Sequence, residues 1–267
     1  EGVAFTVATA IKIKPARIQA LARASAIIDV VAVADENGVG LSEISRITGL
    51  NKTTAFNLLA SLVTLRFVEQ DRYSRRYRLG LRNLELGRLV QQRLHISALA
   101  RPILAGLCRK TNETVNLGLP DLLDLLVVDS FRGSQILHAT PNAGWRAQYH
   151  CTALGKAFMM RWDGLRRQTI YNSTGLPRKT ANTITDVDTL EIQLAKFGKQ
   201  GYALDCEENE IGVNGIGRAI RDGLGEIAAA ISVSGPANRL TRGAMERIAP
   251  EVLAAAGLVT KAIGGDD

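Results

Sequence analysis

The chain has 267 residues and a mass of 28.8 kDa, with 46% hydrophobic and 5% aromatic residues. This length and composition exclude a disordered chain and predict two globular domains, each with its own core. The net charge is +7, and residues 1–100 hold 14 Lys and Arg against 8 Asp and Glu, whereas the rest hold 19 against 18. The sequence therefore predicts a polyanion-binding N-terminal domain and a C-terminal domain with another task.

Cysteine and histidine are too few and too scattered to predict a disulfide framework or a metal site. The three cysteines, Cys108, Cys151 and Cys206, show no CxxC spacing, and the three histidines stand apart from one another. No apolar run reaches the roughly 18 residues of a membrane-spanning helix, and the first residues lack the apolar core of a signal peptide. We therefore expect no metal, no cofactor, no membrane association and a cytoplasmic location.

In chain order, residues 1–16 predict a loosely attached tail, and residues 17–35 predict a first helix. The stretch 41–68 then predicts two short helices joined by a turn at Gly49. Ser42 is expected to cap the first of these helices and Asn51 the second. Two short helices joined by a glycine-containing turn are typical of a helix-turn-helix DNA reader.

The second of these helices has a polar outer face. Its apolar residues repeat at helical spacing along one side, which leaves the opposite side polar. An ordinary amphipathic helix has the same pattern, so this helix alone leaves both interpretations open. In a DNA reader, its first turns and the preceding helix would offer these residues to phosphates and base edges in a major groove: Lys52, Thr53, Thr54 and Asn57, with Ser42.

A basic hairpin follows the two helices and favours the DNA reader. Residues 67–71 and 75–79 predict short strands around a three-residue loop, with Tyr77 and Leu79 alternating with arginines. A hairpin in this position is a wing. Four arginines are expected to lie along the sugar-phosphate backbone or to reach into a minor groove: Arg72, Arg75, Arg76 and Arg78.

The second half predicts an α+β domain of the small-molecule sensor type, because its strands and helices come in separate runs. A connecting helix over 81–93 and an amphipathic helix over 96–111 precede it, the latter with Leu99, Ile103, Leu104 and Leu107 facing inward. Strands are expected at 115–119, 123–130, 135–139, 202–205, 213–220 and 226–234, and helices at 151–162, 165–171, 187–199 and 238–263. We expect a DNA-binding domain at 1–80, a linker helix at 81–95 and a ligand-binding domain at 96–267.

Three segments of the second half carry polar groups that suit a small anionic ligand. Small residues around Ala153 and Leu154 open a predicted helix whose free amides would favour a carboxylate. Asp205 ends a predicted strand, and Ser232 and Ser234 share one face of another. The acidic run at 207–210 is expected to be solvated. Each segment also has a purely structural explanation, since helix starts and serines commonly bond neighbouring backbone.

The second hypothesis is a catalytic α+β domain that carries an incidental basic module at its N-terminus. His150 and Cys151 are adjacent and would point to opposite faces of a strand, which argues against a nucleophile with its base. Gly215 and Gly217 resemble a dinucleotide fingerprint only until Ile220, where Gly or Ala is required. The residues therefore favour binding over catalysis.

Five motifs stand out along the chain: LSEISRITGLNKTTAFNLLASL, YRLG, HCTALGKAF, GYALDCEENEIGV and ISVSGP. Together they resemble the IclR family of bacterial transcriptional regulators over nearly the whole chain. The resemblance implies a winged helix-turn-helix, a linker helix and a GAF-like effector domain. It also implies a homodimer or homotetramer on a palindromic double-stranded operator, and a repressor or activator of a catabolic operon that responds to a ligand.

The resemblance also implies a set of effector-binding residues in this chain: Ala153, Leu154, Asp205, Val213, Gly215, Ser232 and Ser234. The family usually has Pro, Cys and an Ala-Ala-Pro segment where this chain has Ile211, Gly215 and residues 217–219. Gly215 in place of a thiol predicts a larger pocket, and Arg218 would add a carboxylate partner if it points inward. We therefore expect a carboxylate larger than the smallest keto acids, for example an aromatic one. In the reader, Asn57 stands where the family often has Arg, and Asn pairs bidentately with adenine.

Overall fold

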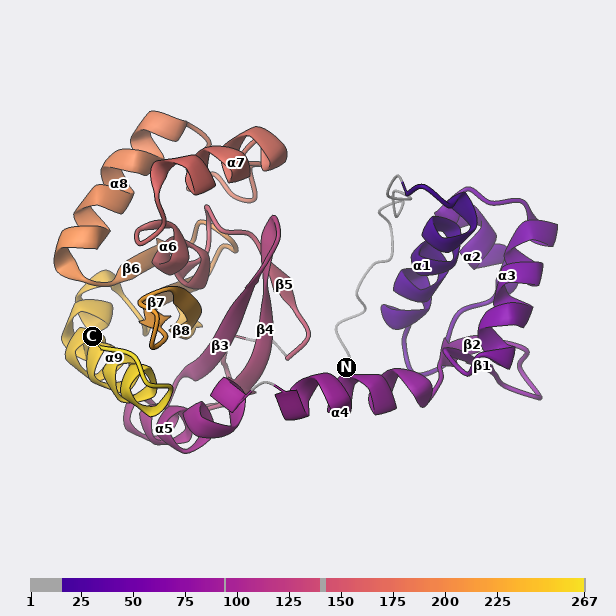
Figure 1. Cartoon of the computed structure of the whole chain (residues 1–267), viewed down its shortest axis with the longest axis horizontal. Coiled ribbons are helices and arrows are strands. Elements are labelled where there is room, and N and C mark those ends of the chain that lie inside the picture. Colours follow the sequence, from indigo (N-terminus) through magenta and orange to yellow (C-terminus); the bar gives the residue numbers. More distant parts are fainter. Residues whose placement is uncertain (1–15, 94, 140–142, 267) are drawn as a thin grey trace. The chain divides into compact units, whose positions relative to one another are not determined.

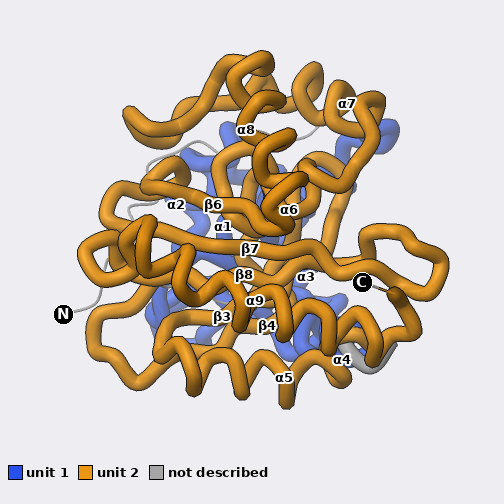
Figure 2. The backbone as a smooth tube through the Cα atoms, turned by 90° about the vertical axis from the view of Figure 1, so that its left-hand side faces the viewer, with its two compact units in different colours: residues 1–93 blue, residues 94–267 orange. Residues whose placement is uncertain are grey.

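The computed structural model describes residues 16–93, 95–139 and 143–266. The chain divides into two compact units, residues 1–93 and residues 94–267, which Figure 2 distinguishes by colour. Residues 1–15 of the expected N-terminal tail lie outside the described residues. In the described part of the chain, no helix is long and apolar enough to cross a membrane.

The first unit consists of helices and a two-stranded wing (Figure 1). Its elements are α1 (Gln19–Ala32), α2 (Leu41–Thr48), α3 (Lys52–Thr64), β1 (Val68–Gln70), β2 (Tyr77–Leu79) and α4 (Arg82–Arg93). The two strands pair antiparallel, with Glu69 opposite Arg78. Buried side chains of the three helices and the wing share one core: Ile27, Val30, Ile44, Leu59, Val68 and Tyr77. Because the wing contributes to this core, its position relative to α3 is fixed.

The turn between α2 and α3 is set by backbone conformation and by two side-chain bonds. Gly49 follows α2 with φ 69°, a left-handed conformation that favours glycine. The Oδ1 atom of Asn51 accepts a hydrogen bond from the Thr54 amide at 2.8 Å, and Ser45 Oγ donates to the Leu50 carbonyl at 2.5 Å. The expected glycine turn and the expected Asn51 cap are both confirmed.

The expected cap at Ser42 is wrong. α2 begins one residue earlier, at Leu41, and its N-cap is Gly40, which has no side chain to bond. The Gly40 carbonyl accepts from the amides of Glu43 and Ile44 at 3.1 and 3.0 Å, so the first helical bonds already form at Gly40. Ser42 therefore lies within the first turn, with its side chain exposed.

The second unit is α+β, and its described residues form one antiparallel sheet in the order β5-β4-β3-β8-β7-β6. Figure 1 shows α6 on one side of this sheet and α5 with α9 on the other. The strands are β3 (Thr114–Asp121), β4 (Asp124–Phe131), β5 (Arg146–Ala147), β6 (Ala203–Cys206), β7 (Val213–Arg221) and β8 (Ile227–Pro236). The helices are α5 (His95–Thr111), α6 (Ala153–Met159), α7 (Gly164–Thr174), α8 (Val187–Gln200) and α9 (Arg242–Ala262).

Two expectations for the second unit are wrong. Residues 135–139 form no strand, and the strand beside β4 is β5 instead. Ile136 is 98% exposed, and the Ala139 carbonyl accepts from Thr114 Oγ1 at 2.7 Å, so a side chain rather than a strand ladder holds this segment. Leu99 of α5 is 42% exposed rather than inward, whereas Leu104 and Leu107 are buried as expected.

The Asn51 cap gives the first prediction. Asn51→Ala should lower the free energy of unfolding of the first unit by about 1 kcal/mol, because the Thr54 amide loses its acceptor. The matched control is Ser42→Ala, which should change it by less than about 0.5 kcal/mol because Ser42 is not the cap of α2. Urea denaturation followed by circular dichroism measures both values. Equal losses in the two variants would contradict the assignment of the cap.

Candidate DNA-reading surface and effector site

The outer side of α3 carries the expected polar residues. Lys52, Thr53 and Asn57 are exposed, whereas Thr54 is half-buried and its amide is engaged by the Asn51 cap. The inner side packs into the core through Ala55, Leu59 and Leu62, which are all buried. The first turns of α3 therefore present a cation, a hydroxyl and an amide on one accessible surface, as a major-groove reader requires.

The tip of the wing is ordered by a single carboxylate. Asp71 Oδ1 accepts from the amides of Tyr73 and Ser74 at 3.1 and 2.7 Å and from Ser74 Oγ at 2.9 Å. The bond from the Ser74 amide is the main reason that the pKa of Asp71 is held below its usual value. Arg72 and Arg75 are exposed on this turn, and Tyr73 between them is 97% exposed.

Our sequence interpretation did not assign Tyr73 to the site. Its signal in the sequence is an aromatic residue two positions after an Asp in a short loop, where an Asx-turn holds the backbone. Tyr73 lies at position i+2 of this turn, and its side chain is exposed. The ring is therefore presented at the wing tip, beside the two exposed arginines.

The other two wing arginines have partners within the first unit. Arg76 donates from Nε and Nη2 to the Gly38 carbonyl at 2.9 and 2.8 Å, and its Nη2 lies 3.7 Å from Glu43. Arg78 Nη2 lies 3.7 Å from Asp71. Arg76 thus ties the wing to the loop before α2, so its replacement would disturb the wing itself.

Strand register places three of the expected effector residues in one row across the sheet. Asp205 of β6 lies opposite Gly215 of β7, Gly215 lies opposite Ser234 of β8, and Ser234 lies opposite Thr114 of β3. Residues paired in this way share one side of a sheet. Val213 lies two positions before Gly215 on β7 and is half-buried. The row therefore joins residues that are far apart in the sequence.

A second row runs parallel to the first. Ser232 lies opposite Gly217 on one neighbour and opposite Asn116 on the other. The buried Asn116 amide donates to Ser232 Oγ at 3.4 Å, and Ser130 Oγ donates to Asn116 Oδ1 at 2.9 Å. Ser232 thus belongs to a buried polar chain whose Asn116 member our sequence interpretation missed.

Helix α6 covers these two rows at very short range. A Cβ atom on Gly217 would lie 2.5 Å from the Ala153 carbonyl oxygen, and one on Gly118 would lie 3.3 Å from Leu154 Cδ1. A Cβ atom on Gly215 would lie 3.2 Å from both Ala153 Cβ and Ser234 Oγ. Ala153 therefore faces the rows, whereas Leu154 packs beside them against Gly118. Gly215 serves close packing where the sequence predicts additional pocket space.

Two further details differ from expectation. The start of α6 is capped by Thr152, whose Oγ1 accepts from the Gly155 amide at 3.0 Å, so one amide expected to face an anion is already used. Arg218 lies one position beyond Gly217 on β7, and its Nη1 donates to the Gly201 carbonyl at 2.7 Å. Since neighbouring strand residues alternate in direction, Arg218 points away from the row of Asp205 and Ser234.

A buried charged cluster adjoins the row. Lys156 of α6 is fully buried, and its Nζ lies 2.5 Å from Glu208 Oε1 and 3.1 Å from Gln193 Oε1. The expectation of a solvated acidic run is wrong for Glu208, which is buried because it pairs with Lys156. Asp205 Oδ1 accepts from the Glu208 amide at 2.8 Å, and burial raises the pKa of Asp205 to about 7.

The described residues of this region do not arrange a nucleophile beside a base. Cys151 is buried, and burial raises the pKa of its thiol to about 12, so the thiol stays protonated. His150 Nε2 lies 3.1 Å from the Pro177 carbonyl oxygen. Within 16–93, 95–139 and 143–266, no group of three His, Cys, Asp or Glu side chains is placed to hold a metal ion.

Comparison with known proteins finds a matching family model for each of the two units. Residues 20–72 match the model of the IclR helix-turn-helix domain, and residues 89–261 match that of the bacterial transcriptional regulator IclR C-terminal domain. The HTH-type transcriptional repressor AllR of Salmonella typhi is 32% identical over 226 residues, 84% of this chain and 82% of that protein.

Two further relatives cover more of the chain. The acetate operon repressor of Salmonella typhimurium is 29% identical over 252 residues, 93% of this chain and 91% of that protein. The crystal structure of the Thermotoga maritima IclR is similar with a TM-score of 0.74 and 29% identity, over 91% of this chain and 98% of that one. These relatives are transcription regulators rather than enzymes. The chain therefore belongs to the IclR family of DNA-binding transcriptional regulators.

Proposed function

We propose that the chain is a repressor or activator of a small-molecule catabolic operon and that a small carboxylate controls it. The observation that carries the proposal is the row formed by Asp205, Gly215 and Ser234 beneath α6, in the same chain as a helix-turn-helix reader. A row of polar groups beneath one helix is suited to bind a small ligand. If the protein has two conformations that differ in DNA affinity, a ligand that binds one of them more tightly shifts the equilibrium toward it.

The chemistry of the row supports a carboxylate as the ligand. Ser234 is a hydroxyl donor, and Asp205 with a pKa of about 7 carries a proton that it can donate below that pH. The buried Lys156 adds a positive charge, which Glu208 offsets. The relative named the acetate operon repressor regulates an operon named for a small carboxylate.

For the DNA complex, we propose that α3 enters a major groove and that the wing follows the backbone. Asn57 would read an adenine, with Lys52, Thr53 and Thr54 beside it, while Arg72 and Arg75 would contact phosphates. The exposed side chains on α3 and at the wing tip support this arrangement. Because its partner is operator DNA, we infer that the protein acts in the cytoplasm.

We further propose that two or four copies assemble. Helix α4 exposes an apolar series in the single chain, namely Leu84, Leu86, Leu89 and Val90. Exposed apolar residues at helical spacing favour contact with another helix, and a second copy is the simplest partner. A homodimer would also supply two readers for a palindromic operator, and a homotetramer would supply four.

The wing and α3 give a prediction for DNA binding. Arg72→Ala and Arg75→Ala should weaken binding to all sequences about equally and lower the salt slope by about 1 each, because each loses a phosphate contact. Asn57→Ala should instead reduce preference at one base pair by about 1–3 kcal/mol. Fluorescence anisotropy in a salt series, on a duplex selected from a random library and on its scrambled form, measures both effects.

The matched control for these variants is Arg109→Ala, which removes the same charge from an exposed position in the second unit. Its binding should equal that of the unchanged protein. Binding that ignored both salt and the two wing variants would show that the wing is not part of the DNA-binding surface.

The proposed effector site gives a second prediction. Small carboxylic acids, aliphatic and aromatic, are screened by thermal shift, because a ligand of the folded state raises the melting temperature by mass action. Ser234→Ala should weaken the response to an active acid by about five- to tenfold, the effect of one lost hydrogen bond, without changing DNA affinity in the absence of ligand. The control is Ser173→Ala, an exposed serine of α7.

Two outcomes would count against this proposal. A full ligand response in Ser234→Ala would remove Ser234 from the site. A screen in which amines or sugars stabilise the protein and carboxylic acids do not would refute the ligand class.

A further inference from the structure

An aromatic side chain lies on the outer surface of α3, among the residues assigned to the DNA reader. Phe56 follows Lys52 by four positions and Thr53 by three, and it precedes the exposed Ala60 by four. Residues three or four apart are neighbours on the surface of a helix. Asn57, the next residue in the chain, is exposed as well. The ring of Phe56 therefore borders a cation and a hydroxyl on the surface that presents the Asn57 amide.

Packing within the first unit leaves much of this ring uncovered. The helix packs into the unit through five other apolar residues: Ala55, Leu58, Leu59, Leu62 and Val63. These residues are buried or half-buried, whereas Phe56 is 50% exposed. A fully covered aromatic side chain buries roughly 150–250 Å², so about half of that area is available on Phe56 to a partner that binds this surface.

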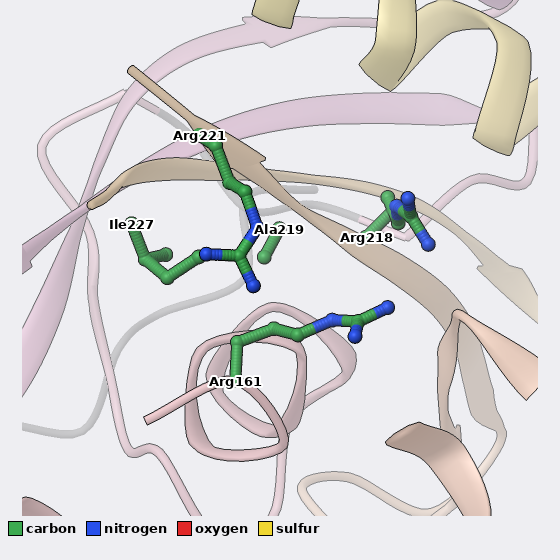
Figure 3. A pocket seen from close by; sticks show the side chains of 5 residues that line it. All are labelled: Arg161, Arg218, Ala219, Arg221 and Ile227. Atoms are coloured by element: carbon green, nitrogen blue, oxygen red, sulfur yellow. The ribbon is translucent and has the colours of Figure 1, made fainter. Parts of the chain in front are cut away.

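The arginine side chains around a small pocket of the second unit are engaged differently. Figure 3 shows the residues that line this pocket: Arg161, Arg218, Ala219, Arg221 and Ile227. Arg218 donates to the Gly201 carbonyl at 2.7 Å. Arg221 donates to the Gly225 carbonyl at 2.7 Å, so both side chains hold turns of their own unit. The exposed part of Phe56 belongs instead to the helix that we assign to DNA reading.

The major groove of DNA offers a chemical match for an apolar side chain, namely the 5-methyl group of thymine. Phosphates and base-edge acceptors suit Lys52 and Thr53, and an adenine edge suits Asn57, but none of these groups suits a phenyl ring. We propose that Phe56 packs against the methyl group of a thymine and makes the reader prefer thymine at that position. The inference rests on the proposed entry of α3 into a major groove.

The charge beside Phe56 favours DNA over a second copy of the chain as the partner of the ring. In a symmetric dimer the same surface of each copy forms the contact. A contact through Phe56 would therefore bring the Lys52 side chains of two copies into one interface, where like charges repel. The same lysine attracts a phosphate backbone. Contact with DNA thus satisfies both the ring and its cationic neighbour.

The test removes the methyl group from the DNA. In a duplex selected from a random library, each thymine is replaced in turn by deoxyuridine, which lacks only the 5-methyl group, and binding of the full chain is measured by fluorescence anisotropy at one salt concentration. At one thymine of each half-site the replacement should weaken binding by about three- to fivefold, the effect of exposing one methyl group. Phe56→Ala should bind the thymine duplex more weakly and should not distinguish deoxyuridine from thymine at that position.

The matched control is Leu65→Ala, which also removes an exposed apolar side chain at α3. Leu65 is 59% exposed and follows the last residue of the helix. It lies nine residues after Phe56, roughly two and a half turns, and therefore on the opposite side of the helix axis. Leu65→Ala should keep the full sensitivity to deoxyuridine. Phe56→Leu, which retains an apolar side chain, should keep part of it.

Other results would overturn the proposal. If no deoxyuridine replacement weakens binding of the unchanged protein, no methyl contact exists, and this result needs no variant to fold. If Phe56→Ala keeps the sensitivity to deoxyuridine at every position, another residue makes the contact. Circular dichroism verifies that each variant is folded, and Phe56→Leu provides a second variant.

Failure of this inference can be told apart from failure of the proposed reader. If Asn57→Ala still alters base preference while no deoxyuridine replacement has an effect, α3 reads DNA without the help of Phe56. If neither Asn57→Ala nor the wing variants alter binding, the reading surface itself is assigned wrongly.

Discussion

The close approach of α6 to β7 is the constraint on which the effector domain depends. It is possible only because β7 carries glycine, since a Cβ atom on Gly217 would lie 2.5 Å from the Ala153 carbonyl oxygen. This approach sets Ala153 against Gly215 and Ser234, and it carries Lys156 into the interior, where an ion pair must form because a lone buried charge is costly. One packing contact thus defines both the polar row and the charged cluster beside it.

A few hydrogen bonds likewise position the DNA-reading unit. Asn51 fixes the start of the recognition helix, and Asp71 orders the wing tip through three hydrogen bonds. Arg76 hydrogen-bonds the Gly38 carbonyl and so fixes the wing, which carries the exposed Arg72, to the loop before α2. In both units, buried or bonded polar groups position the residues that we propose to contact DNA or the effector.

Local features of the fold can be predicted from the sequence, and features set by distant partners cannot. The Asn51 cap needs only residues three apart, and its prediction is confirmed. The Ser42 cap fails because a backbone carbonyl, that of Gly40, starts the helix without a side chain. The burial of Glu208 cannot be predicted from a local sequence pattern, because its partner Lys156 lies 52 residues away in the chain. The direction of Arg218 is a local feature as well: Arg218 lies three positions after Gly215 on β7, so alternation along the strand puts the two residues on opposite faces.

Communication between the two units is the central claim, and reciprocal binding tests it most directly. If an effector changes operator affinity by some factor, operator DNA must change effector affinity by the same factor. The measurement is the Kd of an active carboxylate for the full chain, alone and saturated with operator duplex. We predict that the two Kd values differ by the ratio of operator Kd values with and without the carboxylate. Identical carboxylate Kd values in both titrations would contradict the account.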